Sequence, residues 1–245
     1  MIPIERIIDK LEYHFGQEDL TSARLLLQYW RAEAQSTGDE RGLIEMLNEQ
    51  LGLFRRLNDE AASDEAIATL LPILKGGEWL ETLSGATMLL NVATNYCHFG
   101  HPEQALPLYP EVEATFRAHL APYDYRLAGL FNNRAACLRA LRDYDGAIEL
   151  YTQALDQLSH LQGYEAEQAV SLVNRATARY QRAPLDPLVD EDMQAAFAVL
   201  LGDLPHDSNY VFVLGKLIPI FEHLGYERES AELRSRRALA QSALR

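Results

Sequence analysis

Asparagine recurs at nearly constant spacing along the middle of this 245-residue chain, each time two residues before an alanine. Asn91, Asn133 and Asn174 lie 42 and 41 residues apart. A carboxamide has two N–H donors and a carbonyl acceptor, so one side chain can bond a peptide N–H and C=O together. A row of such amides can hold an extended peptide without reading its side chains. The recurrence itself predicts a solenoid of stacked units, since repeats of about 40 residues are typical of that architecture.

Residues that could support catalysis do not converge in the sequence. The seven histidines are scattered, and His98-x-x-His101 with Glu103 straddles a predicted turn and lacks a fourth metal ligand. There is no glycine-rich phosphate loop, nucleophile elbow or Cys-x-x-Cys. We therefore predict a protein that is not an enzyme and that uses no metal or cofactor.

Overall charge excludes several classes of partner. The formal net charge is −14 and the isoelectric point about 4.9, so nucleic acids and anionic membrane surfaces are not expected to bind. The longest apolar run, from Tyr210 to Phe221, contains Lys216 and is too short to span a membrane. We expect a cytoplasmic protein, and the excess of arginine over lysine suggests a bacterium with a GC-rich genome.

Helical periodicity covers almost the whole chain, and no stretch alternates with period two. Ser63 and Asp143 can cap helix starts, Gly100 and Gly225 can end helices, and Pro219 should kink its helix or delay its start. The expected helices are 3–14, 18–36, 39–57, 61–75, 79–99, 102–118, 122–142, 144–161, 164–182, 190–202, 207–224 and 227–243. These twelve antiparallel helices form six pairs of about 40 residues without a linker, which predicts one domain, 1–245.

Small and aromatic residues follow the asparagines at fixed distances, which allows paired helices to pack closely. Two sets share this spacing: Ala93, Ala105, Tyr109 and Val112, then Ala135, Ala147, Tyr151 and Ala154. The pattern resembles the tetratricopeptide repeat (TPR) family, most specifically over 86–161, and its step is similar to that of kinesin light chains and bacterial repeat proteins. The resemblance implies an all-α fold, an α-α superhelix, with repeat cores 39–75, 86–119, 128–161 and 170–202. Residues 1–36 and 207–243 would be diverged capping pairs. After Ala176 the spacing requires an insertion, with Ala195 or Ala196 at the packing position.

The resemblance also implies that the first helix of each pair lines a concave groove. Asn91, Asn133 and Asn174 would then contact peptide, with Asn48 as a looser fourth. Their helical stripes and neighbours complete the predicted groove: Thr94, His98, Asn132, Arg139, Thr177 and Gln181. The alternative is that the amides bond neighbouring helices and stabilise the stack.

Seven arginines between residues 126 and 182 form a local basic region, which includes Arg134, Arg139, Arg175, Arg179 and Arg182. This region could recognise an acidic segment. The alternative, which we favour, is pairing with Glu149, Asp156, Glu165 and Glu167 on nearby helices.

The sequence thus predicts a scaffold that binds a protein or extended peptide in its groove. The alternative is a sensor of signalling peptides or small ligands, as in some bacterial repeat proteins. Self-association through an end helix pair such as 227–243 is compatible with either function.

Overall fold

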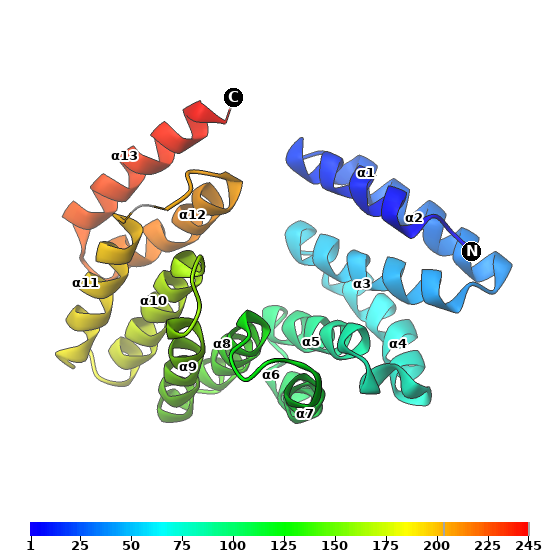
Figure 1. Cartoon of the computed structure of the whole chain (residues 1–245), viewed down its shortest axis with the longest axis horizontal. Helices are drawn as coiled ribbons and strands as arrows, with labels where there is room; N and C mark the ends of the chain where they lie inside the picture. Colours follow the sequence, from blue (N-terminus) through cyan, green and yellow to red (C-terminus); the bar gives the residue numbers. More distant parts are fainter. Residues whose placement is uncertain (203, 245) are drawn as a thin grey trace. The chain divides into compact units, whose positions relative to one another are not determined.

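The computed structural model describes residues 1–202 and 204–244, and all regular structure in these residues is helical (Figure 1). Asp203 and Arg245, both inside the predicted 1–245 domain, lie outside the described residues. Internal contacts divide the chain into two compact units, Met1–His119 and Leu120–Arg245. The single-domain organisation stays a prediction.

Unit 1 contains three helical pairs in chain order. Its helices are α1 (Ile4–Gly16), α2 (Leu20–Thr37), α3 (Glu40–Leu57), α4 (Glu60–Gly76), α5 (Leu83–His98), α6 (Pro102–Ala105) and α7 (Tyr109–His119), with 3-10 turns η1 (Glu78–Glu81) and η2 (Leu106–Leu108). Each helix from α1 to α5 packs on the next one along the chain, α7 packs on α5, and α3 also packs on α5. The first helices α1, α3 and α5 therefore alternate with second helices, as expected for stacked pairs.

Unit 2 has the same organisation. Its helices are α8 (Tyr125–Ala140), α9 (Tyr144–Ser159), α10 (Glu165–Arg182), α11 (Leu188–Leu200), α12 (Ser208–His223) and α13 (Glu227–Ala243). The first helix α10 contacts both helices of the preceding pair and the first helix α12 of the next. Ala196 is fully buried in the last core cluster and takes the predicted packing position after the 183–187 insertion.

The turn inside most pairs uses a residue with left-handed backbone followed by a helix-capping residue. Glu18, Asn58, Gly100, Arg142 and Gly225 all have positive φ at this turn. The next residue caps the following helix with its carboxylate at Asp19, Asp59 and Asp143, which accept an N–H of the first turn. The left-handed residue ends one helix and the cap starts the next, so each pair folds back tightly. Gly100, Gly225 and Asp143 were predicted in these roles.

Close helix crossings use the alanines that the sequence singled out. Ala93, Ala105, Ala135, Ala147 and Ala176 are all completely buried. The aromatic residues that follow, Tyr109 and Tyr151, are buried as well. Their absence of solvent exposure confirms the repeat spacing as a packing signal.

Three local predictions were wrong in detail. Ser63 does not cap α4, because Asp59 accepts the N–H of Ala62 at 3.1 Å while Ser63 lies buried inside the helix. The expected helix 79–99 begins only at Leu83, after η1. The expected helix 102–118 is divided by η2, where Pro107 and Pro110 cannot donate to the helical ladder. A separate prediction concerned Pro219, which lies inside α12; this helix starts at Ser208 and is not delayed, so the kink stays a prediction.

Candidate functional site

The predicted groove residues of unit 1 lie along α3 and α5. Asn91 donates from Nδ2 to Oδ1 of Asn48 at 2.8 Å, and Asn48 in turn donates to Glu49 at 3.2 Å. Both asparagines are half-buried. This amide contact joins two successive first helices, which is the geometry of the stacking alternative. The side-chain Oδ1 of Asn91 has no hydrogen-bond partner among the described residues.

Asn95, which sequence reasoning missed, lies one turn after Asn91 and is fully buried. Its Nδ2 donates to the backbone carbonyl of Asn91 at 2.8 Å, and its Oδ1 accepts from Ser63 Oγ at 3.0 Å. The pair connects α4 to α5 beneath the half-buried amide. The backbone of Asn91 is thus held by a hydrogen bond from a buried side chain.

Thr94 and His98 complete the predicted stripe of α5. Thr94 Oγ1 donates to the backbone carbonyl of Leu90 at 2.8 Å. His98 is exposed; partial burial of the ring, and then the charge of Arg55, hold the pKa of His98 below its usual 6.5. The other histidine considered for a metal site, His101, contacts Glu60 of α4 through Nε2 at 2.7 Å. No cluster of three metal-ligating side chains occurs among the described residues.

Charged residues of α3 extend the same surface and were not predicted. We call Glu45, Asn48, Glu49, Arg55 and Asn91 the unit 1 face. Burial raises the pKa of Glu45 and of Glu49, and the carboxylates of Glu45 and Glu12 raise that of Glu49 further. Residues three and seven apart lie on the same side of a helix. Applied to Asn48, this spacing would have found Glu45, three residues before it, and Arg55, seven after it.

The unit 2 face is formed by Asn132, Asn133 and Arg139 of α8 with Asn174 and Gln181 of α10. Asn132 donates from Nδ2 to Ser171 Oγ at 2.8 Å and to the backbone carbonyl of Ala128 at 3.1 Å, which links the two first helices. Arg139 donates to Gln181 at 3.3 Å. Asn133 is half-buried on α8.

Asn174 differs from the other predicted amides. Its side chain is half-buried and makes no hydrogen bond to the residues that the structure describes. Thr177 on the next turn donates to its own helix, to the carbonyl of Val173 at 2.8 Å. All the donors and the acceptor of the Asn174 amide are therefore open to a ligand.

The basic region is largely neutralised by carboxylates. Arg175 forms a bidentate pair with Asp192 at 2.7 and 3.1 Å, and Arg179 contacts the same carboxylate at 3.1 Å. Arg182 pairs with Asp145 and Asp186 at 2.7 and 2.8 Å. Pairing was the favoured interpretation, but the partners predicted for these three arginines were wrong. Asp192 lies on α11, after the insertion that the spacing required, but the spacing did not reveal that its carboxylate meets Arg175 and Arg179 of α10.

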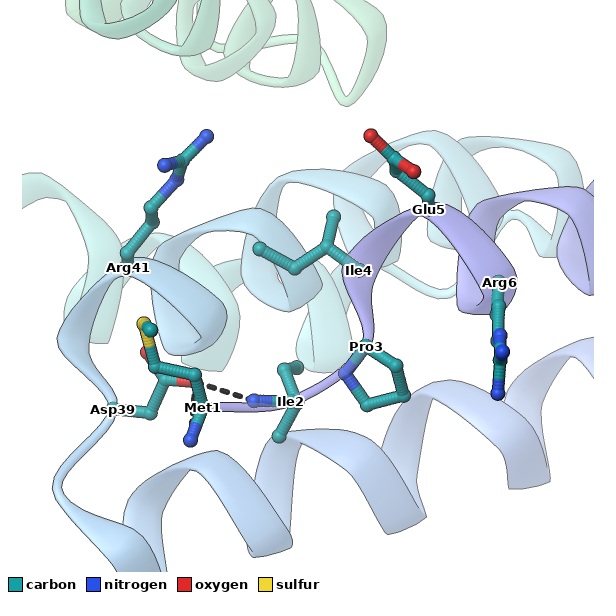
Figure 2. A pocket seen from close by; sticks show the side chains of 8 residues that line it. All are labelled: Met1, Ile2, Pro3, Ile4, Glu5, Arg6, Asp39 and Arg41. Atoms are coloured by element: carbon teal, nitrogen blue, oxygen red, sulfur yellow. Dashed lines mark hydrogen bonds and ion pairs between the residues drawn. The ribbon is translucent and has the colours of Figure 1, made fainter.

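Two hollows of unit 1 lie away from these amides. One, of about 400 Å³, is lined by Met1 to Arg6 with Asp39 and Arg41 (Figure 2). There Asp39 accepts the backbone N–H of Ile2 at 2.7 Å while it also caps α3 through Gly42. The other, of about 330 Å³, lies beside α2, α3 and α4 and includes Arg24, Arg31 and Gln50. Both are open to solvent.

Comparison with solved structures identifies the fold. Nearly identical TPR-like repeats of a Podosopora anserina protein assigned to the kinesin light chains align with a TM-score of 0.58 and 16% identity, over 81% of this chain and 95% of that chain. A point variant of those repeats aligns with a TM-score of 0.59 and 16% identity, over 81% and 94% of the two chains. The fold is TPR-like.

A third solved structure, BtubC (BKLC) from P. vanneervenii, aligns over 100% of this chain and 93% of that chain at 16% identity, with a TM-score of 0.49. No protein-family model matches the sequence, and no curated protein does. Among the described residues, no helix combines the length and apolar character that crossing a membrane requires. The bacterial origin stays a prediction.

Proposed function

We propose that this protein is a non-enzymatic scaffold that binds an extended peptide or protein segment on the first-helix faces of its two units. The carrying observation is Asn174, a half-buried amide without a partner among the described residues. Asn91 supports it, since its side-chain Oδ1 has no partner among the described residues, although its Nδ2 donates to Asn48. Amides in this state can take up the N–H and C=O groups that an extended backbone presents.

The TPR-like fold supports the same proposal, because repeat solenoids present extended surfaces rather than closed pockets. A small-ligand sensor would need an enclosed cavity. The two hollows of unit 1 are open to solvent and lie apart from the amides, so they do not favour the sensor.

Selection of displayed random peptides against the full-length protein tests the proposal. We expect the wild-type protein to enrich peptides whose binding is lost in Asn174→Ala or in Asn91→Ala. The control is Gln194→Ala, on the exposed side of α11, with folding checked by circular dichroism. If peptides enriched on the wild type bind both asparagine variants equally well, the faces are not the binding surface and the proposal is wrong.

A further inference from the structure

Arg55 on the unit 1 face is a partly buried cation that lacks a hydrogen-bond acceptor for one of its guanidinium nitrogens. It lies in the last turn of α3, half-buried, and its Nη1 is out of contact with solvent and has no hydrogen-bond partner. No carboxylate among the described residues forms an ion pair with it. A guanidinium offers five N–H donors, and burying one without acceptors is costly. Burial lowers the pKa of Arg55, consistent with a missing partner.

Two carboxylates on the same face lack cations. Glu45 and Glu49 lie one turn apart on α3, and neither forms an ion pair among the described residues. The charged groups around them are Glu12 of α1, which adds to the negative charge, and Arg41 and Arg55, which act on Glu45 and Glu49 from a distance. Partly desolvated carboxylates in this state bind a cation favourably.

Spacing along α3 sets how far apart the two charges lie along the helix axis. Glu49 and Arg55 are six residues apart and Glu45 and Arg55 ten, which corresponds to about 9 and about 15 Å along the helix. An extended peptide advances about 3.3 Å per residue and places alternate side chains on one side. Residues two or four apart therefore span about 7 or about 13 Å, and long side chains cover the difference. Asn48 lies between Glu45 and Arg55 along α3, and its side chain accepts from Asn91, so these amides are next to the charges where the peptide backbone would pass.

We propose that the segment bound by unit 1 carries a basic and an acidic side chain two or four residues apart, with the basic group on Glu45 and Glu49 and the acidic group on Arg55. This inference rests on the proposed function and specifies its ligand. A purely acidic peptide would leave the two glutamates unpaired and would be repelled by them. A purely basic peptide would leave Arg55 unpaired.

The test compares peptides selected from a displayed random library by the full-length wild type, by Arg55→Gln and by the double variant Glu45→Gln, Glu49→Gln. The wild type is expected to enrich peptides with the two charges at the stated spacing. Arg55→Gln should lose the preference for the acidic residue alone, and the double variant the preference for the basic residue alone. Arg228→Gln, an exposed arginine of α13 without an ion pair among the described residues, is the control.

A peptide-side substitution repeats the test on the unaltered protein. Replacing the acidic residue of a selected peptide by its amide should weaken binding to the wild type by about tenfold or more, and should leave binding to Arg55→Gln unchanged. Peptides that bind through Asn91 without the charge pair overturn this inference and leave the proposed function intact. If no form of the protein enriches a peptide, both are overturned.

Discussion

Asn91 and Asn95 lie one turn apart on α5, and the same side chain has a different environment at each position. Asn95 is completely buried and bonded at both ends, to Ser63 and to the Asn91 carbonyl. Asn91 is half-buried, and its side-chain Oδ1 has no hydrogen-bond partner among the described residues. The first position is suited to stabilising the stack and the second to contact with a ligand.

Replacing Asn95 by alanine is expected to lower the free energy of unfolding by about 1–3 kcal/mol, because the buried Ser63 hydroxyl loses its acceptor. Urea denaturation followed by circular dichroism measures it. Asn174→Ala is the matched control and should change the value by less than about 0.5 kcal/mol, since its amide makes no bond among the described residues. Equal losses in the two variants would contradict the distinction.

The arginine region contains a buried and an exposed ion pair that should differ in strength. Asp192 is 3% exposed and meets Arg175 and Arg179, so Asp192→Asn should cost about 3 kcal/mol or more by leaving buried guanidinium charge uncompensated. Asp145, which pairs with Arg182, has a side chain 82% exposed. Asp145→Asn should cost less than about 1 kcal/mol. Thermal denaturation of both variants decides, and a loss at Asp145 as large as that at Asp192 would refute the assignment.

Glu49 should make stability depend on pH. Burial raises the pKa of Glu49 above its ordinary 4.5, so the folded state binds its proton more tightly than the unfolded state. That stabilisation is complete below about pH 4.5 and is lost as the pH rises through the folded-state pKa. Glu49→Gln should therefore be more stable than the wild type at pH 7 and similar to it near pH 4, measured by urea denaturation.

Asp39 provides the opposite slope as a control. The backbone N–H groups of Gly42 and Ile2 hold the pKa of Asp39 below its ordinary 3.8. The wild type should exceed Asp39→Asn in stability at neutral pH, and the difference should shrink as the pH falls through the folded-state pKa. If the difference in free energy of unfolding between Glu49→Gln and the wild type stays constant with pH, burial does not control the pKa of the Glu49 carboxylate.

At the scale of elements, η1 is a connector that holds three helices of unit 1. Trp79 Nε1 donates to Glu40 of α3 at 3.3 Å, and the Leu80 carbonyl accepts from Thr115 of α7 at 2.7 Å. The start of α5 lies against this turn so closely that a Cβ on Gly85 would be 2.0 Å from the Trp79 carbonyl oxygen. Only glycine fits there without displacing backbone.

Gly85→Ala is therefore expected to destabilise unit 1 by about 1–3 kcal/mol, as overpacking does. Gly52→Ala is the matched control, because Gly52 lies inside α3 with no atom near its added Cβ. That substitution should stabilise the protein by about 0.5–1 kcal/mol, the difference in helix propensity. Differential scanning calorimetry would measure both, and a Gly85→Ala variant as stable as the wild type would show that η1 can shift.

Most helices could be predicted from sequence because apolar residues repeat at helical spacing and because glycine and aspartate mark the turns. Helix boundaries were less certain. Ser63 has a side chain that can cap a helix, but the residue that caps α4 is Asp59, four residues earlier. The period of the asparagines pointed to the candidate amides, and their role in binding stays a prediction. The Asn48–Asn91 contact and the Asp192 pairs could not, because they depend on which residues of neighbouring helices meet. Arg55 could have been found from its spacing of seven residues from Asn48, but its lack of a hydrogen-bond partner at Nη1 could be seen only in the structure.

At the scale of the whole molecule, each of the two units contains fully buried apolar side chains among the described residues. Leu51 of α3 is fully buried in unit 1, and Leu214 of α12 is fully buried in the last cluster of unit 2. In helical repeats, stability is approximately a sum of units and of contacts between neighbours. Damage to one core should therefore remain local.

Leu214→Ala is expected to cost about 2–5 kcal/mol and to accelerate amide hydrogen exchange in α10 to α13, with little change in α3. Leu51→Ala should give the reverse pattern. Hydrogen–deuterium exchange read by mass spectrometry resolves these segments. Uniform acceleration through the whole chain in either variant would show instead that the units unfold as one.

The tryptophan of η1 has a practical consequence. The chain has two tryptophans, Trp30 on α2 and Trp79 on η1, and both belong to unit 1. Indole emission excited selectively over tyrosine therefore originates in unit 1 alone. The unmodified protein already contains an optical probe of the unit with the unit 1 face, so titration with a peptide can be followed there without a label, whereas events confined to unit 2 require an introduced fluorophore.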